Sequence, residues 1–131
     1  MKKTIINTPE APSPIGPYNQ AVLVNDTLYL SGQIPLISET MTLLSDTVEA
    51  ETELVMKNLK VVLKAAHMDF ENVVKTSIFL DNMENFAAVN SVYGSFFDEA
   101  TAPARETVAV KTLPKSVRVE IKYRCDVCSF L

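Results

Sequence analysis

Apolar residues recur at helical spacing through the middle of the chain. The stripe consists of Val48, Val55, Leu59, Val62 and Ala66, with Leu54 and Leu63 widening it. Steps of three, four and seven residues place these side chains on one face of a helix. Asp46 followed by Glu49 resembles a capping box, which satisfies free N–H groups at the start of a helix. The pattern therefore predicts an amphipathic helix over residues 47–66.

A second apolar face follows about twenty residues further on. It is formed by Phe86, Val89, Tyr93, Phe96 and Phe97. Asp81 or Asn82 is the expected N-cap, because both side chains accept hydrogen bonds from free N–H groups of a first turn. Asn90 lies four residues after Phe86 and so shares this face, where a buried amide must find a partner.

Runs of β-favouring residues predict the strands of a sheet. These runs cover residues 21–24, 27–30, 73–80, 105–111 and 117–124. Asn25-Asp26 between the first two runs is typical of a hairpin turn. In the last run Val117, Val119, Ile121 and Tyr123 alternate with Arg118, Glu120, Lys122 and Arg124, so the two sets face opposite ways.

Strands grouped around two amphipathic helices predict an α+β fold, with both helices on one face of a mixed sheet. Consecutive apolar residues at 21–24 and 78–80 indicate that the other face is buried as well. A second subunit is the economical candidate for that cover. The 131 residues suit a single domain over 1–131.

Two segments are predicted to be loops. Residues 9–17 hold four of the seven prolines, and Pro cannot donate a backbone hydrogen bond. Residues 36–45 also lack a clear pattern. Between strand 27–30 and this second loop, Ser31-Gly32-Gln33-Ile34-Pro35 interrupts the strand pattern, with Gly32 allowing another group to approach the backbone closely.

Composition narrows the range of partners. Twelve Lys and Arg against sixteen Asp and Glu give a net charge of −4, which lacks the basic surplus that binds phosphate backbones. We therefore expect no nucleic-acid partner. No apolar run is long enough for a signal peptide or a membrane span, so a cytoplasmic protein without membrane contact is expected.

The chain offers few of the residues used in metal and nucleophilic sites. His67 is its only imidazole, so acid–base chemistry would use Glu, Asp, Tyr or Lys, and no metal site is expected. Cys125 and Cys128 form a C-x-x-C near the C-terminus. The pattern follows a strand rather than opening a helix, so we interpret it as a reduced, frayed terminal pair.

Five short segments together carry a family resemblance. They are Ile15-Gly16-Pro17-Tyr18, Ser31-Gly32-Gln33-Ile34-Pro35, Asn90-Ser91-Val92-Tyr93, Pro103-Ala104-Arg105 and the run Leu113-Pro114-Lys115-Ser116-Val117-Arg118-Val119-Glu120-Ile121. As a set, in this order, they resemble the RidA family, also called the YjgF family, from about Thr4 to Tyr123. The resemblance implies a chorismate-mutase-like fold and a homotrimer with a barrel-like core and ligand clefts between subunits.

The resemblance also implies an activity. Members of the family deaminate reactive 2-iminoacids and their enamine tautomers, 2-aminoacrylate and 2-aminocrotonate, to 2-ketoacids and ammonia without metal or organic cofactor. By position, Arg105 is similar to the arginine that binds the substrate carboxylate, and Glu120 to the acid/base glutamate. Tyr18, Asn90 and the Ser31-Gly32 backbone match residues that line the cleft, and Thr107 stands where the family often has Cys.

These residue types suit the chemistry. A guanidinium binds a planar carboxylate through two parallel charge-assisted hydrogen bonds. A carboxylate can accept a proton from attacking water and return it to the leaving nitrogen. On pattern alone, however, Arg105 and Glu120 are ordinary surface charges. If strands 105–111 and 117–124 form a hairpin, the two share a face only when opposed residues have numbers summing to an odd value. The sequence leaves two other arrangements open: the residues meet across subunits, or they act on opposite sides of one ligand.

The sequence leaves two other functions open. Glu106 beside Arg105 would weaken anion binding if both faced the cleft. That possibility keeps open a non-catalytic trimer that binds small carboxylates as a regulator. A ribonuclease or translation inhibitor, suggested by some family members, finds little support in the net charge of −4 and the single His.

Overall fold

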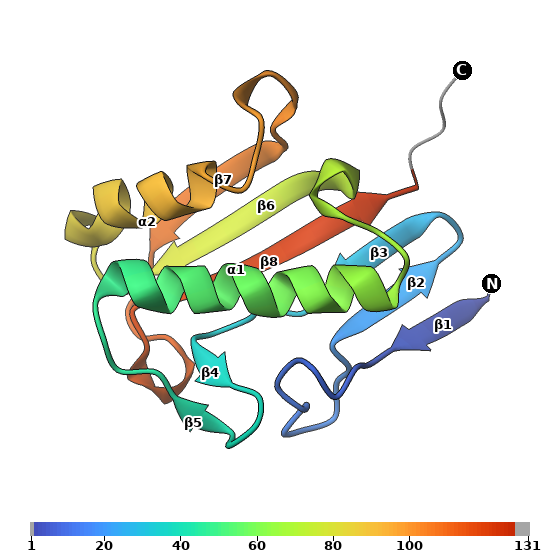
Figure 1. Cartoon of the computed structure of the whole chain (residues 1–131), viewed down its shortest axis with the longest axis horizontal. Coiled ribbons are helices and arrows are strands. Elements are labelled where there is room, and N and C mark those ends of the chain that lie inside the picture. Colours follow the sequence, from blue (N-terminus) through green and yellow to red (C-terminus); the bar gives the residue numbers. More distant parts are fainter. Residues whose placement is uncertain (1, 128–131) are drawn as a thin grey trace.

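Six strands form one mixed sheet, shown in Figure 1, in a computed structural model that describes residues 2–127. In spatial order they are β1 (Lys3–Ile6), β2 (Ala21–Val24), β3 (Thr27–Leu30), β8 (Val119–Asp126), β6 (Val73–Leu80) and β7 (Ala104–Ala109). Only β6 and β7 pair in parallel, and the other neighbours are antiparallel. The β2–β3 hairpin turns at Asn25-Asp26 as predicted, with Asn25 at a φ of 54°.

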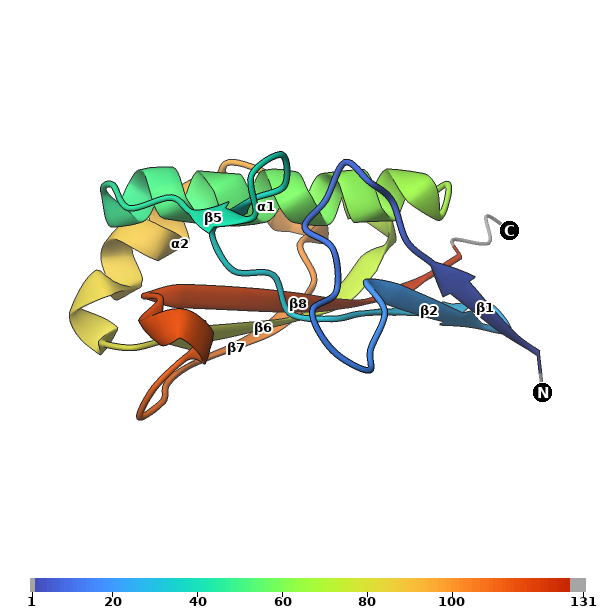
Figure 2. The same ribbon diagram turned by 90° about the horizontal axis from the view of Figure 1, so that it is seen from below.

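Two helices, α1 (Val48–Ala65) and α2 (Phe86–Gly94), cover one face of the sheet, and the other face is open within this chain (Figure 2). The predicted α+β architecture is confirmed. The core lies between the helices and the sheet, where Leu59 and Leu63 meet Ile78 and Ile121. Burial alternates along β8, with Val119, Ile121, Tyr123 and Cys125 facing the helices.

Helix α1 matches the predicted range, but its cap differs. Thr47 is the N-cap, and its hydroxyl accepts a hydrogen bond from Ala50 N at 3.1 Å. Asp46 lies one residue earlier and accepts from Thr47 N at 2.7 Å. The predicted Asp46–Glu49 capping box is therefore wrong. The Thr hydroxyl adjoins the first helical residue and takes the role that the spacing had suggested for Asp46.

The second helix begins in two steps. Asn82 caps a short 3-10 helix, η2 (Met83–Asn85), and α2 follows directly. Phe96 and Phe97 lie beyond the end of α2 but remain part of its aromatic cluster, with the Phe97 ring centroid 4.8 Å from that of Tyr93. Of the two predicted caps, Asn82 does cap a turn, but the turn is η2; α2 itself follows Asn85, which makes no side-chain cap hydrogen bond. Val89 and Tyr93 of the predicted apolar face are buried in α2.

The structure corrects one expected connection and decides a pairing that the sequence left open. Residues 36–45 contain a small antiparallel pair, β4 (Leu36–Ile37) and β5 (Thr42–Leu43), rather than only a loop. The chain between β7 and β8 does not form a hairpin, because β6 lies between these two strands. This connection passes through the 3-10 turn η4 (Pro114–Ser116), in which Lys115 and Ser116 both have positive φ.

Two further 3-10 turns join the main elements. They are η1 (Phe70–Asn72) and η3 (Glu99–Thr101). Within the described part of the chain, neither α-helix is long and apolar enough to cross a membrane.

Candidate active site

A cleft of about 670 Å³ opens beside the N-terminal loop. Four predicted site residues line it: Tyr18, Ser31, Gly32 and Glu120. We call these four the cleft group. Tyr18 comes from the proline-rich loop, Ser31 and Gly32 follow β3, and Glu120 projects from β8. Three segments far apart in the sequence therefore meet around one concavity.

The cleft group includes a very close contact between Gly32 and Glu120. A Cβ built on Gly32 would lie 2.5 Å from Glu120 Oε2 and 2.8 Å from its Cδ. Gly32 does not have positive φ, so backbone conformation does not require glycine here. The predicted close approach to Gly32 is confirmed, and the approaching group is the Glu120 carboxyl. Any larger residue at position 32 would push this carboxyl away.

Glu120 is half-buried, and its environment alters its acidity. Burial raises the pKa of the Glu120 carboxyl above its ordinary value, and the Lys122 ammonium, on the same face of β8, opposes part of that rise. A carboxylate with a raised pKa is a stronger base than one in bulk water. The raised pKa therefore suits the Glu120 carboxyl to accept and release a proton in a reaction.

The other predicted site residues lie elsewhere. Arg105 Nη1 donates a hydrogen bond to Asn90 Oδ1 at 2.6 Å. The guanidinium also lies 5.2 Å from the Tyr93 ring centroid and 5.8 Å from that of Phe86. Within residues 2–127 no carboxylate forms an ion pair with it. The cation is thus oriented by a neutral amide and two aromatic faces, with its charge uncompensated.

Asn90 corrects one expectation. The side chain is exposed rather than buried on the apolar face of α2. It sits at the margin of that face, where it can reach the edge strand β7 and accept the hydrogen bond from Arg105. The amide has a partner, as a polar group needs, but the partner is a cation beside solvent.

Thr107 lies two residues beyond Arg105 on the same side of β7. Its Oγ1 is buried and has no hydrogen-bond partner in the described part of the chain. Such hydroxyls are uncommon in folded proteins because their desolvation is not compensated. We call Arg105, Asn90 and Thr107 the guanidinium group. It combines an uncompensated cation with a free hydroxyl.

The two groups occupy opposite faces of the sheet. Arg105 is in register with the buried Thr76, and Thr107 with the buried Ile78, so both point to the helix-covered side. Glu120 is in register with Phe79, on the open side. Because β7 and β8 are separated by β6, the hairpin register considered from the sequence does not arise. Within one chain the two groups do not face a common ligand.

Comparison with known proteins decides the family. The model of the family described as Endoribonuclease L-PSP, which comprises the RidA proteins, matches residues 8–125. The chain belongs to the RidA family.

Relatives in this family bear different names. The chain is 45% identical to 2-iminobutanoate/2-iminopropanoate deaminase of Dermatophagoides farinae, over 92% of this chain and 93% of that protein. It is 48% identical to a Lactococcus lactis protein named as a regulator, AldR, over 95% of this chain and 98% of that one. The crystal structure of RidA from Psychrobacter sp. superposes with a TM-score of 0.90 at 37% identity, covering 95% of this chain and 99% of that one.

Glu106 does not join the guanidinium group of this RidA-family chain. It lies opposite Ser77 on the open face and accepts a hydrogen bond from Ser77 Oγ at 2.8 Å. Lys75 Nζ is 2.7 Å from its other oxygen. Hydrogen bonds from Lys75 and Ser77 lower the pKa of Glu106. The expected weakening of anion binding by Glu106 therefore loses its basis, because the acid and Arg105 point in opposite directions.

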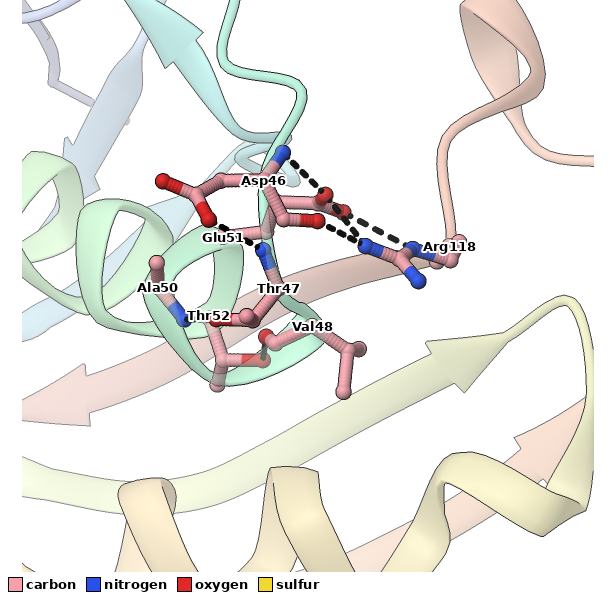
Figure 3. A network of polar contacts seen from close by, with 7 residues as sticks. All are labelled: Asp46, Thr47, Val48, Ala50, Glu51, Thr52 and Arg118. Atoms are coloured by element: carbon pink, nitrogen blue, oxygen red, sulfur yellow. Dashed lines mark hydrogen bonds and ion pairs between the residues drawn. The ribbon is translucent and has the colours of Figure 1, made fainter.

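Arg118 also differs from the sequence prediction. It precedes β8, and its side chain turns toward α1 instead of joining the open face (Figure 3). Its Nε and Nη2 donate to the two carboxylate oxygens of the buried Glu51 at 3.1 and 2.5 Å, and Nη2 also contacts the Asp46 carbonyl. Asp46 N donates to Glu51 Oε2 at 3.1 Å. This network joins the start of α1 to the segment that leads into Glu120.

The sequence did contain a signal for this pair. Glu51 lies three residues after Val48 and four before Val55, on the buried stripe of α1. A carboxylate there needs a cationic partner, and the sequence could not say which one.

Cys125 is not frayed. It lies in β8 and is fully buried, and this burial raises the pKa of its thiol to about 12. That part of the prediction is wrong, because the last strand ends two residues later than predicted, at Asp126. Cys128 lies outside the described residues.

Proposed function

We propose that this protein deaminates 2-iminoacids and their enamine tautomers, such as 2-aminoacrylate and 2-aminocrotonate, by hydrolysis to 2-ketoacids and ammonia. Membership of the RidA family supports the reaction class. The observation that carries the proposal is the Arg105 guanidinium, held by Asn90 and two aromatic rings and lacking an acidic partner within residues 2–127.

Arg105 would bind the substrate carboxylate. A planar carboxylate fits the guanidinium through two parallel hydrogen bonds, which fixes both position and orientation. The buried Thr107 hydroxyl, two residues away on the same side of β7, would donate a further hydrogen bond to the same ligand. Asn90 would hold the guanidinium in place before the substrate arrives, so that less ordering is needed on binding.

The site would be completed between subunits of a homotrimer. One subunit would contribute the guanidinium group and the next would contribute the cleft group, because the two groups point away from each other in one chain. Cyclic symmetry then gives three equivalent sites from three copies. Exposed apolar side chains on the open face, among them Tyr29 and Val108, favour burial of this face against another subunit.

Glu120 would act first as a general base and then as a general acid. With a protonated imine, its carboxylate accepts a proton as water oxygen adds to the imine carbon, which gives a neutral carbinolamine. That proton then passes to the amino nitrogen and the C–N bond breaks as ammonia leaves. The former carbinolamine hydroxyl gives its proton to the Glu120 carboxylate as the 2-ketoacid carbonyl forms, and the carboxyl releases this proton to ammonia or water. General acid–base assistance of this kind contributes roughly 10²–10⁴-fold. Tyr18 and the Ser31-Gly32 backbone would line the pocket that receives the rest of the substrate.

The assay forms the imine substrate in the reaction mixture. An amino-acid oxidase or a threonine dehydratase supplies the unstable substrate, and ketoacid release is followed with and without the purified protein. We expect Arg105→Ala to lose most of the acceleration, while Glu120→Gln lowers kcat more than it raises KM. Lys60→Ala, an exposed cation on α1, is the control and should behave like the unmodified protein. Absence of any acceleration by the unmodified protein would reject the enzyme.

A second candidate is a non-catalytic trimer that binds small carboxylates as a regulator. The Lactococcus lactis relative with a regulator's name favours it. Calorimetry with a small 2-ketoacid separates the two functions. Binding that depends on Arg105 without any turnover supports the regulator, and binding together with turnover supports the enzyme.

A further inference from the structure

The N-terminal loop that carries Tyr18 satisfies its own backbone only in part, through Ala11 N to Thr8 O at 3.4 Å and Tyr18 N to Gly16 O at 2.8 Å. Four prolines, at positions 9, 12, 14 and 17, remove N–H donors from the segment, while its carbonyl groups remain. Carbonyl groups that leave water need a donor from elsewhere in the chain. Ala11 and Pro12 are buried, so carbonyl groups in this part of the loop require a donor from the protein.

Gln20 supplies that donor. Its side chain is buried, with the residue only 2% exposed. Its Nε2 lies within hydrogen-bonding distance of three carbonyl oxygens, those of Thr8 at 3.0 Å, Ala11 at 3.3 Å and Pro12 at 2.9 Å. Its Oε1 accepts from Thr8 N at 2.7 Å. One amide thus replaces the backbone pairing that the prolines prevent.

The backbone of Asn19 and Gln20 also holds the Ser31-Gly32 segment of the cleft group. Ser31 N donates to the Gln20 carbonyl at 2.9 Å, and Ser31 Oγ donates to the Asn19 carbonyl at 2.6 Å. Gln20 is therefore the point at which the proline-rich loop, the start of β2 and the Ser31-Gly32 segment are tied together. Pro12 and Tyr18 of this loop both line the cleft.

We propose that Gln20 is a positioning residue of the active site, whose buried amide sets the distance between the loop bearing Tyr18 and the Ser31-Gly32 backbone. This inference rests on the proposed deaminase function. Gln20 also lines the cleft, but both ends of its side-chain amide are bonded to the loop, so we assign it no contact with the substrate. Loss of the amide would let the loop shift relative to Gly32 and Glu120, while Arg105 on the other face of the sheet would keep its contacts.

Two replacements separate shape from hydrogen bonding. Gln20→Met keeps the length of the side chain and removes the amide, whereas Gln20→Glu keeps the outline and replaces the N–H donors by an oxygen that faces three carbonyl oxygens. We expect kcat/KM to fall on the order of 10- to 100-fold in both, since small displacements of reacting groups have effects of this size. Thr52→Val is the control, because it removes a buried hydrogen bond to Val48 O within α1, away from the cleft.

The decisive measurement is coupling to Tyr18. Tyr18→Ala, which removes the side chain that lines the cleft, is made in the unmodified protein and in Gln20→Met. If Gln20 acts by positioning the loop, the factor lost on Tyr18→Ala shrinks at least several-fold in the Gln20→Met background. The same factor in both backgrounds, or a Gln20→Met variant as active as Thr52→Val, would overturn the inference.

Hydrogen exchange gives a readout independent of turnover. We expect faster exchange at the Thr8 and Ser31 amides in Gln20→Met and no change there in Arg105→Ala. Unchanged exchange at both amides in Gln20→Met contradicts the positioning role even if activity falls. Lack of turnover in the unmodified protein contradicts the proposed function instead, so the two failures are distinguishable.

Discussion

Replacing Arg118 tests how strongly the network at the start of α1 stabilises the fold. Arg118→Met removes the guanidinium and keeps most of the apolar stem. The Glu51 side chain is only 6% exposed, so its carboxylate would lose two charge-assisted donors and stay largely out of water. Removing one partner of a buried pair costs about 3–5 kcal/mol of unfolding free energy.

The expected loss lies at or just below the lower limit of that range. The Arg118 side chain is 38% exposed, so water can enter where the guanidinium was. In addition, Asp46 N donates to Glu51 Oε2 at 3.1 Å in the unmodified protein, and this bond does not involve the Arg118 side chain. We therefore expect Arg118→Met to lower the unfolding free energy by about 2–3 kcal/mol.

Urea unfolding at one fixed protein concentration measures this loss, because the proposed assembly would make stability depend on concentration. Glu51→Gln and the double variant with Arg118→Met complete a thermodynamic cycle. The double variant should be less destabilised than the sum of the single variants by at least about 1 kcal/mol. Lys57→Met is the matched control, since Lys57 pairs with Glu53 at 3.5 Å on the exposed side of α1. Its expected cost is below about 0.5 kcal/mol.

Two outcomes would refute the reasoning. If Arg118→Met costs no more than Lys57→Met, the network does not contribute measurably to stability. If the single effects simply add, Glu51 and Arg118 act independently despite their contact.

Three further predictions concern the site itself. Gly32→Ala should lower kcat at least about tenfold by displacing the Glu120 carboxyl, whereas Gly94→Ala, whose Cβ would meet nothing within 4 Å, should not; equal kinetics of the two variants would argue against the contact. Burial raises the pKa of Glu120, so kcat/KM should rise with pH through a pKa above the ordinary carboxyl value. Because the Lys122 ammonium opposes this rise in pKa, Lys122→Gln should move the ascending part of the pH profile of kcat/KM to higher pH. Thr107→Val should leave stability unchanged within about 0.5 kcal/mol and raise KM for the imine, because the unliganded hydroxyl has no partner in residues 2–127; a clear stability loss with unchanged KM would contradict this.

The elements that sequence reasoning located well are those whose pattern is local. Helix α1 follows from periodicity over eighteen residues, and the alternation in β8 follows from the period of a strand. The N-cap of α1 was misplaced by one residue, because Asp46 and Thr47 are both competent caps and only the backbone geometry selects between them.

Long-range pairing was beyond the reach of local patterns. Residues 104–109 and 119–126 are near neighbours in sequence, and a hairpin was one pairing that the sequence allowed. The structure inserts β6 between them instead, since β7 can pair with β6 in parallel. The pairing of both strands with β6 decides on which face of the sheet Arg105 and Glu120 lie. The local alternation within each strand does not predict which strand it pairs with.

The division of the candidate site between two sheet faces leads to a test of the proposed assembly. Arg105→Ala and Glu120→Gln should each be nearly inactive alone. If neighbouring subunits supply the two groups, a mixed trimer contains some sites that combine an intact Arg105 from one subunit with an intact Glu120 from the next. Random reassembly of equal amounts should restore about a quarter of the unmodified activity, because each of the two positions is intact with a probability of about one half.

The result distinguishes the two arrangements sharply. If one subunit supplied both groups, every site in the mixture would carry one defect, and the mixture would be no more active than the average of the two variants. Separate unfolding and refolding of each variant before mixing controls for recovery on refolding. Size-exclusion chromatography with light scattering confirms that the mixed species has the mass of a trimer. Activity that appears only after joint refolding would support a site shared across the subunit boundary, and its absence in trimers of verified mixed composition would refute it.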